Sequence, residues 1–214
     1  MAIAIKICGI TELTGLAAAL DAGIDRIGLM FAPNSPRLIN LNVANELAET
    51  ARGKATIIAV LSNPGDKLVA RITQDLRPDF LQLHGKETPD RVRSLWKQHH
   101  IPIIKAFAVS QTRDIADAQR YARTAAEFLF DAKPASDENR TGGFGQAFDW
   151  SLLQDANPAR PWMLAGGLNP ENVGAAIDIC SPTMVDVSSG VESAPGVKDP
   201  ALVAQFCTAV RTKR

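Results

Sequence analysis

The chain repeats one unit eight times: a short apolar or β-branched run, a polar loop, and a stretch with helical spacing rich in Ala and Leu. The predicted strands span residues 4–8, 26–31, 56–61, 79–84, 101–106, 127–131, 162–165 and 183–187. Helices are predicted after them within 13–22, 43–51, 66–75, 89–99, 112–122, 150–153, 169–180 and 200–212. Strict alternation predicts parallel strands, because parallel neighbours need a crossover connection that is usually helical.

The number of units decides between the two common parallel architectures. Eight units in 214 residues average roughly 27 residues each, which is compact for βαβ units and predicts a closed barrel. An open doubly wound sheet is the alternative, and it usually carries a Gly-rich nucleotide turn directly after an early strand. Here Gly143-Phe144-Gly145 comes late in a loop, well past its strand. We therefore predict an α/β fold, a single (β/α)8 TIM barrel, with residues 1–214 forming one catalytic domain.

The composition narrows the class of ligand. Hydrophobic residues make up 46% of the chain, which is too apolar for a disordered protein. The 23 Lys and Arg residues balance 23 Asp and Glu residues, so the formal net charge is zero. Because nucleic-acid binding needs a basic surface, nucleic acid is an unexpected partner and a small molecule is favoured.

The cysteines, the histidines and the N-terminus argue against a disulfide-rich protein, a metal site and a membrane protein. Three dispersed cysteines with no Cys-x-x-Cys pair suggest neither a disulfide framework nor a thiolate zinc site, and they indicate a reducing compartment. Three dispersed histidines without a carboxylate at ligand spacing argue against a metal site. Lys6 and Gly9 interrupt the apolar N-terminus before it could form a signal peptide or a membrane span. We expect a cytoplasmic protein with no membrane association and no metal.

Cys8 is the first candidate catalytic residue, because active sites of such barrels lie at the C-terminal ends of the strands. In the first strand Lys6 and Cys8 share one side and the isoleucines share the other, so Lys6 and Cys8 are predicted to face the barrel interior. A nearby ammonium favours a thiolate, which predicts a pKa of Cys8 below the usual value of about 8.5 and a role as base or nucleophile. The alternative is a small buried hydrophobe, which is the interpretation favoured for Cys180 and Cys207.

Asp131 is the second candidate, since it ends the sixth strand after Phe128-Leu129-Phe130. A partly desolvated carboxyl there suits a general acid, and a capping or loop Asp is the alternative. Asp186 lies near the end of the eighth strand, beside the first strand in a closed barrel, so it could pair with Lys6 in a supporting role.

Two glycine-containing turns predict a phosphate site. Gly166-Gly167 and Ser188-Ser189-Gly190 follow the seventh and eighth strands. Loops at these positions of a TIM barrel often hold phosphate through backbone N–H groups and a helix dipole. Such a site needs no basic side chain, so it is compatible with a chain of zero net charge.

Arg37 and His84 are the remaining binding candidates. Arg37, in the second loop, could hold a planar carboxylate by two hydrogen bonds, although loop arginines are more often solvated. Gln82 and His84 share one side of the fourth strand and could line the site. A strand-end His that hydrogen-bonds a neighbouring loop is the equal alternative.

The chain closely resembles the phosphoribosylanthranilate isomerase family of tryptophan biosynthesis. The resemblance covers nearly the whole chain in order, through Lys6-Ile7-Cys8-Gly9-Ile10-Thr11, Ser35-Pro36-Arg37, Gln82-Leu83-His84-Gly85, Asp131, Gly145, Phe148-Asp149-Trp150, Ala165-Gly166-Gly167-Leu168, Pro170-Glu171-Asn172-Val173, Asp186-Val187-Ser188-Ser189-Gly190-Val191-Glu192 and Pro195-Gly196-Val197-Lys198-Asp199. It implies a monomeric or weakly dimeric barrel that converts N-(5-phosphoribosyl)anthranilate to 1-(2-carboxyphenylamino)-1-deoxyribulose 5-phosphate without a cofactor.

The resemblance also implies roles for individual residues. Cys8 corresponds to the general base, Asp131 to the general acid, and Arg37 to the contact for the anthranilate carboxylate. The glycines of the seventh and eighth loops correspond to the phosphate grip. The chain departs from the family pattern at Glu12-Leu13-Thr14-Gly15 and in the sixth loop, residues 132–147, where Phe144 replaces a small polar residue and Gln146-Ala147 replace Lys-Thr. We expect that Gly-rich loop to act as a mobile lid.

Two other functions compete with this one. A related barrel of histidine synthesis would use paired carboxylates at the ends of the first and fifth strands, and Cys8 in place of the first Asp argues against it. A catalytically inactive barrel could bind a phosphorylated ligand or a partner enzyme, although Cys8, Asp131 and Arg37 are all present.

Overall fold

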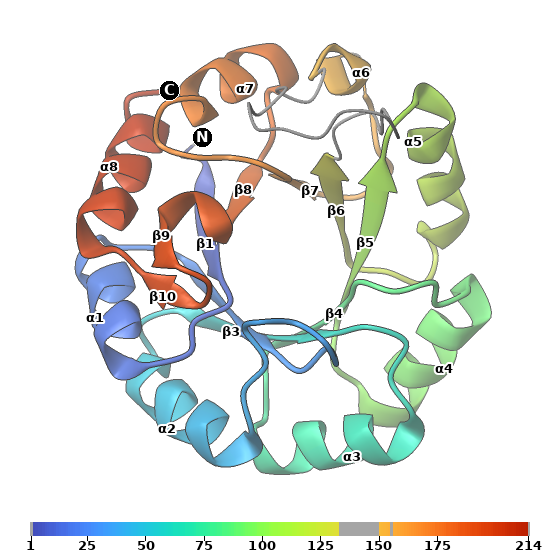
Figure 1. The fold of residues 1–214 in the computed structure, drawn as a ribbon. Helices are drawn as coiled ribbons and strands as arrows, with labels where there is room; N and C mark the ends of the chain where they lie inside the picture. The colour runs from blue at the N-terminus through green and yellow to red at the C-terminus, as the bar shows by residue number, and fades with distance from the viewer. Residues whose placement is uncertain (1, 133–149, 155, 214) are drawn as a thin grey trace.

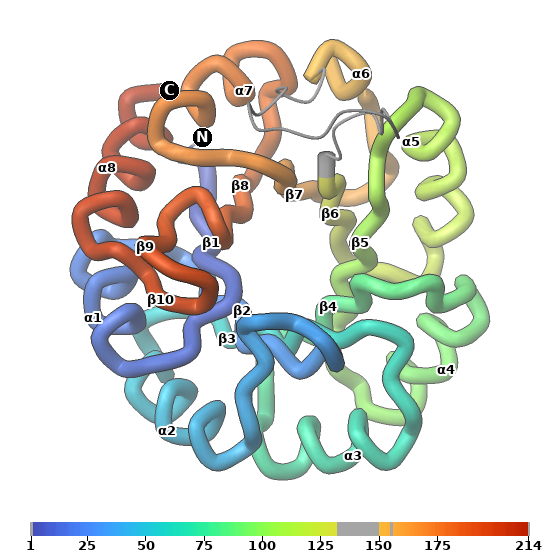
Figure 2. The backbone as a smooth tube through the Cα atoms, in the orientation of Figure 1, coloured from blue at the N-terminus to red at the C-terminus, as the bar shows by residue number. Residues whose placement is uncertain are grey.

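Eight parallel strands close into a barrel with helices around its outside (Figure 1). This computed structural model describes residues 2–132, 150–154 and 156–213. The strands follow chain order around the barrel, and β1 (Ala4–Cys8) closes it by pairing with β8 (Met184–Val187). The prediction of a (β/α)8 barrel is confirmed, and the open doubly wound sheet is excluded. The backbone trace shows the helices as an outer ring around the strands (Figure 2).

The elements agree with the predicted repeat. The other barrel strands are β2 (Arg26–Met30), β3 (Thr56–Leu61), β4 (Phe80–Leu83), β5 (Ile103–Val109), β6 (Glu127–Ala132) and β7 (Trp162–Ala165). The helices are α1 (Leu13–Asp21), α2 (Leu41–Ala51), α3 (Asp66–Asp75), α4 (Pro89–His99), α5 (Thr112–Ala118), α6 (Ser151–Gln154), α7 (Val173–Cys180) and α8 (Pro200–Arg211), with 3-10 turns η1 (Gln119–Tyr121) and η2 (Ser189–Val191). Asn40, Thr88 and Asp199 cap the N-termini of α2, α4 and α8 with side-chain oxygens.

Several details differ from the sequence prediction. Helix α7 begins at Val173 and not at residue 169, and β5 ends at Val109 and not at residue 106. The fifth strand begins at Ile103, after Pro102, because proline has no N–H to donate to a ladder. A short antiparallel hairpin of β9 (Glu192–Ala194) and β10 (Val197–Lys198), which was not predicted, lies between β8 and α8. Its strands are too short to show a hydrophobic period.

The barrel wall separates two apolar cores. The larger one lies between strands and helices and contains Ile5 and Ile7. The smaller one fills the barrel interior and contains Cys8 with buried residues of the other strands. The predicted orientation of the first strand is therefore confirmed. Lys6, on the same side as Cys8, is 1% exposed.

A charged pair fills the N-terminal end of the barrel interior. Arg26, at the start of β2, donates two hydrogen bonds to Glu127 at the start of β6, at 2.6 and 3.0 Å. The Arg26 guanidinium also lies over the ring of Phe80. This layer leaves the opposite, C-terminal end of the barrel for the site. In the described ranges, no helix has the length and apolarity that crossing a bilayer requires.

Candidate active site

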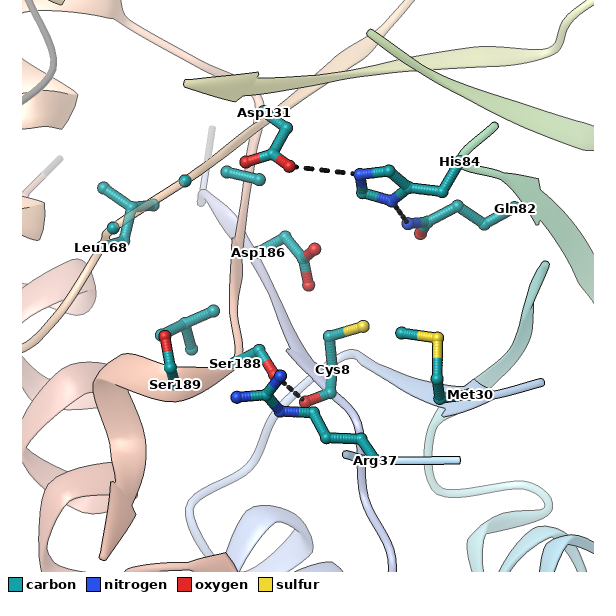
Figure 3. A pocket seen from close by; sticks show the side chains of 14 residues that line it. Cys8, Met30, Arg37, Gln82, His84, Asp131, Leu168, Asp186, Ser188 and Ser189 are labelled. Atoms are coloured by element: carbon teal, nitrogen blue, oxygen red, sulfur yellow. Dashed lines mark hydrogen bonds and ion pairs between the residues drawn. The ribbon is translucent and has the colours of Figure 1, made fainter. Parts of the chain in front are cut away.

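A pocket of about 240 Å³ opens at the C-terminal ends of the strands. Its walls combine side chains from six strands or the loops that follow them (Figure 3). The lining residues are Cys8, Met30, Arg37, Gln82, His84, Asp131, Ala165, Gly166, Gly167, Leu168, Asp186, Val187, Ser188 and Ser189. Strands β7 and β8 separate β6 from β1 along the shorter way around the barrel. Asp131 and Cys8 therefore reach the pocket from different sides.

Cys8 stands above a buried ion pair. Lys6 Nζ donates to Asp186 Oδ1 at 2.9 Å, as the sequence suggested. Burial raises the pKa of the Cys8 thiol, and the charge of Lys6 lowers it only in part. The expectation of a lowered pKa is wrong, because desolvation of the thiolate outweighs the ammonium, which is itself shared with Asp186. Although burial disfavours the Lys6 ammonium, Asp186 and Cys8 raise the pKa of Lys6.

The Cys8 thiol occupies space that a glycine leaves free. Gly28 lies opposite Cys8 in the β1–β2 register. A Cβ atom at position 28 would lie 2.7 Å from Cys8 Sγ and 3.2 Å from Lys6 Cε. Gly28 is therefore required for the position of the thiol.

His84 connects two other side chains of the pocket. Its Nε2 lies 3.2 Å from Asp131 Oδ2, and its Nδ1 lies 3.1 Å from Gln82 Nε2 (Figure 3). In this orientation of the Gln82 amide its Nε2 donates to Nδ1, and the imidazole hydrogen then lies on Nε2, toward Asp131. Between the two interpretations of His84, the structure shows a residue that lines the pocket and pairs with a carboxylate on another strand.

Arg37 is held by a carboxylate from the hairpin region. Its Nε and Nη2 donate to Glu192 Oε1 and Oε2 at 2.7 and 2.6 Å. Lys198 Nζ donates to Glu192 Oε1 at 2.6 Å and also lies within hydrogen-bond distance of the Ser188 carbonyl and hydroxyl. Although burial opposes ionisation, hydrogen bonds from Arg37 and Lys198 lower the pKa of Glu192 to about 2. Arg37 is thus fixed at the pocket edge.

The two glycine-containing turns lie together at one side of the pocket. Gly166 and Gly167 have φ of 93° and 65°, in the region that favours glycine. Ser188 Oγ donates to the Cys8 carbonyl at 2.9 Å, so the turn after β8 is tied to the end of β1. A Cβ at Gly190 would lie 1.9 Å from the Leu168 carbonyl oxygen, so Gly190 allows the two turns to pack closely.

The structure brings together nearly all predicted site residues. Cys8, Arg37, His84, Asp131, Gly166, Gly167, Ser188 and Ser189 line one pocket, whereas Gly190 packs behind it. The sequence did not predict Met30 in the wall or the Glu192–Lys198 support of Arg37, and it gave Asp186 a supporting role without placing it in the wall. The predicted lid loop, residues 132–147 with Phe144, lies outside the described residues except for Ala132. Among the described side chains, no three His, Cys, Asp or Glu lie close enough to share a metal ion.

Comparison with known proteins identifies the family. A family model described as N-(5'-phosphoribosyl)anthranilate (PRA) isomerase matches residues 5–209. The chain belongs to the PRA isomerase family. A PRA isomerase of Rhodopseudomonas palustris (strain BisB5) is 46% identical over 211 residues, covering 99% of this chain and 97% of that protein.

Solved structures of PRA isomerases share the fold. The crystal structure of the enzyme from Thermotoga maritima is 34% identical and has a TM-score of 0.88, covering 98% of this chain and 99% of that one. A PRA isomerase in complex with reduced 1-(o-carboxyphenylamino)-1-deoxyribulose 5-phosphate is 32% identical, with a TM-score of 0.84 and the same coverage. The family assignment therefore applies to the whole barrel, and it decides against the alternative of histidine synthesis.

Proposed function

We propose that this PRA isomerase converts N-(5-phosphoribosyl)anthranilate to 1-(2-carboxyphenylamino)-1-deoxyribulose 5-phosphate, a step of tryptophan synthesis, by general acid–base catalysis without a cofactor. The observation that carries the proposal is that one thiol and one carboxyl group, Cys8 and Asp131, reach the same pocket from different sides of the barrel. An acid and a base on opposite sides of a sugar are the groups that an Amadori rearrangement needs.

Asp131 is the proposed general acid. It protonates the furanose ring oxygen, the bond between that oxygen and C1′ breaks, and the anilino nitrogen lone pair forms the iminium ion. Cys8, as thiolate, then removes the proton from C2′, and the electron pair of that C–H bond neutralises the iminium to give an enolamine. Transfer of the C2′ hydroxyl proton to Asp131 and of the Cys8 proton to C1′ gives the ketone and returns both groups to their starting states. Since the thiol is buried and its pKa is raised, the thiolate depends on the nearby Lys6 charge.

The two ends of the substrate are held by different groups. We place the phosphate at Gly166, Gly167, Ser188, Ser189 and Gly190, where the turns after β7 and β8 offer backbone N–H groups. Arg37 contacts the anthranilate carboxylate, and its fixed guanidinium supports this role. His84 contacts the substrate between these ends. Holding both ends orients the sugar between acid and base.

The test uses two substitutions with matched controls. Cys8→Ser and Asp131→Asn should each reduce kcat at least a hundredfold in a protein that remains folded by circular dichroism. Cys207→Ser, in α8, and Asp90→Asn, exposed on α4, should keep kcat within twofold. Full turnover in either site variant would refute the role of that residue. Growth of a tryptophan auxotroph lacking this step separates an active isomerase from an inactive barrel.

We also propose that residues 1–214 act as one domain, as a monomer or weak homodimer in the cytoplasm. The described residues expose six large apolar side chains, Leu13, Leu38, Leu68, Trp96, Ile179 and Val197. Six such side chains offer little apolar area for an obligate interface, which supports a monomer or a weak dimer. Free Cys8, Cys180 and Cys207 suit a reducing compartment. Sedimentation equilibrium over a concentration series tests the oligomeric state, and a tight dimer at nanomolar concentration would refute it.

A further inference from the structure

Gln82 is a fully buried polar residue to which the acid–base mechanism gives no role. It lies on β4 two residues before His84, so both side chains point to the same side of the strand. Its Nε2 lies 3.1 Å from His84 Nδ1. Its Oε1 is buried and has no hydrogen-bond partner among the described residues. A buried amide atom without a partner is costly, and turning the amide only exchanges which of its two atoms lacks one, so the orientation is set by the protonation of His84.

The amide of Gln82 has two hydrogen-bonding arrangements of nearly equal shape. A half-turn about its last side-chain bond exchanges the donor nitrogen and the acceptor oxygen. With Nε2 toward His84, Nδ1 accepts, and the imidazole hydrogen sits on Nε2, where it donates to the Asp131 carboxylate. With Oε1 toward His84, Nδ1 donates to that oxygen, and the amide nitrogen takes the place that has no partner among the described residues.

The second arrangement is the one that a general acid requires. This inference rests on the proposed role of Asp131. As the general acid, Asp131 must carry a proton before the sugar ring opens. When that proton lies on Asp131 Oδ2, the oxygen that faces His84 Nε2, Nε2 must accept it, so the imidazole hydrogen lies on Nδ1 and a Gln82 donor facing Nδ1 does not fit. We propose that Gln82 is a positioning residue: its oxygen accepts the Nδ1 hydrogen of His84 and so keeps the His84–Asp131 pair protonated for catalysis.

Among the described neighbours of His84, Gln82 is the residue placed to set which imidazole nitrogen carries the hydrogen. Lys105 Nζ donates to the carbonyls of Leu83 and Gly85, at 3.1 and 2.8 Å, which fixes the backbone on both sides of His84. Asp131 on β6 is the charged group in contact with His84 among the described residues. Asp186 on β8, Cys8 on β1 and Arg37 after β2 line the same pocket, and Lys105, paired with Glu87, contacts the backbone beside His84. In the described part of the chain, Gln82 is the residue that hydrogen-bonds Nδ1.

The test replaces Gln82 by Met, which removes the amide group and keeps a side chain of similar volume. Gln82→Met should lower kcat about tenfold with KM within twofold, and the alkaline limb of the pH–rate profile should move to lower pH. Gln82→Glu keeps an acceptor for the Nδ1 hydrogen and should recover most of the lost kcat. The matched control is Gln98→Met, since Gln98 is exposed on α4. A merely structural role would reduce stability without moving the pH profile.

Nitrogen-15 NMR of the imidazole rings reports the tautomer directly. The chain has three histidines, so the ring signals of His84 are readily assigned with a His84→Asn variant. In ligand-free wild type, Nε2 should carry the hydrogen at high pH, and Nδ1 should gain one as pH falls. In Gln82→Met that gain should occur only at lower pH. An unchanged titration of His84 Nδ1 together with a wild-type pH–rate profile would overturn the proposal.

Failure of this inference differs from failure of the proposed function. If Gln82→Met folds poorly, the NMR titration of the wild type and the kinetics of Gln82→Glu still test the positioning role of Gln82. A wild-type Nδ1 that never carries a hydrogen within the active pH range refutes the role of Gln82 alone. Full activity of Asp131→Asn refutes the acid itself and therefore both proposals.

Discussion

Arg37 and Glu192 face each other through two parallel hydrogen bonds, although 155 residues separate them in the chain. Paired N–H donors of a guanidinium match the two oxygens of a carboxylate, which fixes direction as well as distance. The Arg37 side chain is therefore oriented before any ligand arrives.

Glu192→Gln should raise KM severalfold and change kcat less. The neutral amide cannot accept both hydrogen bonds of Arg37, so the guanidinium loses its fixed orientation at the pocket edge. Steady-state kinetics measures the effect. Glu49→Gln is the control, since Glu49 also pairs with an arginine, Arg52, but is exposed on α2. An unchanged KM in Glu192→Gln would show that Arg37 needs no such support.

The same carboxylate should make stability depend on acid pH. The pKa of Glu192 is lowered from 4.5 to about 2, so its contribution to stability is complete above pH 5 and disappears as pH falls toward 2. Urea unfolding at a series of pH values from 6 to 2 should show a shallower loss of stability in Glu192→Gln than in wild type. Equal slopes in the two proteins would contradict the lowered pKa.

Lys6→Met should move the acid limb of the pH–rate profile to higher pH. Lys6 opposes the burial that raises the pKa of the Cys8 thiol, so its removal raises that pKa further. It also leaves Asp186 buried without its partner, which costs about 3 to 5 kcal/mol. The double variant Lys6→Met/Asp186→Asn separates the loss of stability from the change in the pKa of Cys8. It should regain stability, because no charge is left buried alone, and it should keep part of the shift of the acid limb. An acid limb at its wild-type position in both variants would refute the electrostatic role of Lys6.

Gly28→Ala should reduce kcat while the barrel stays folded. The new methyl group would lie 2.7 Å from Cys8 Sγ, so the thiol must move. Because misplacement of a reacting group by about 1 Å can cost a hundredfold in rate, a loss of that order is expected. Gly65→Ala is the control, since its Cβ meets nothing within 4 Å. Wild-type kcat in Gly28→Ala would show that the thiol position is not critical.

Gly190→Ala should weaken binding of the substrate's phosphate end. Its Cβ would meet the Leu168 carbonyl oxygen at 1.9 Å and push apart the turns after β7 and β8. We expect KM, and Ki for inorganic phosphate, to rise at least tenfold, measured by steady-state inhibition. Gly65→Ala again controls for an added methyl group. Unaltered inhibition by phosphate would place the phosphate elsewhere.

The periodicity of the sequence was sufficient for the barrel and for much of the site. Alternation in the first strand placed Lys6 and Cys8 inside, and the strand ends indicated where Asp131, His84 and the two glycine-containing turns would meet. This works because strand period and barrel closure determine which side chains converge.

Interactions that depend on long-range contacts could not be predicted in this way. The pairing of Arg37 with Glu192 requires a two-strand hairpin too short to leave a pattern. The direction of the Cys8 pKa shift required knowing the depth of burial, because the ammonium of Lys6 and the loss of water act in opposite directions. The contact between His84 and Asp131 depends on side-chain reach across β5, which lies between their strands.

The two apolar cores bear on how this barrel can change over evolution. Most buried apolar side chains lie between strands and helices, whereas the pocket adjoins the smaller interior core that includes Cys8, Ala106 and Ala165. Substitutions at the mouth therefore disturb few of the contacts that keep the chain folded. A lineage could exchange the reacting groups at the strand ends for others, and so acquire a new reaction, while the outer shell preserves the scaffold.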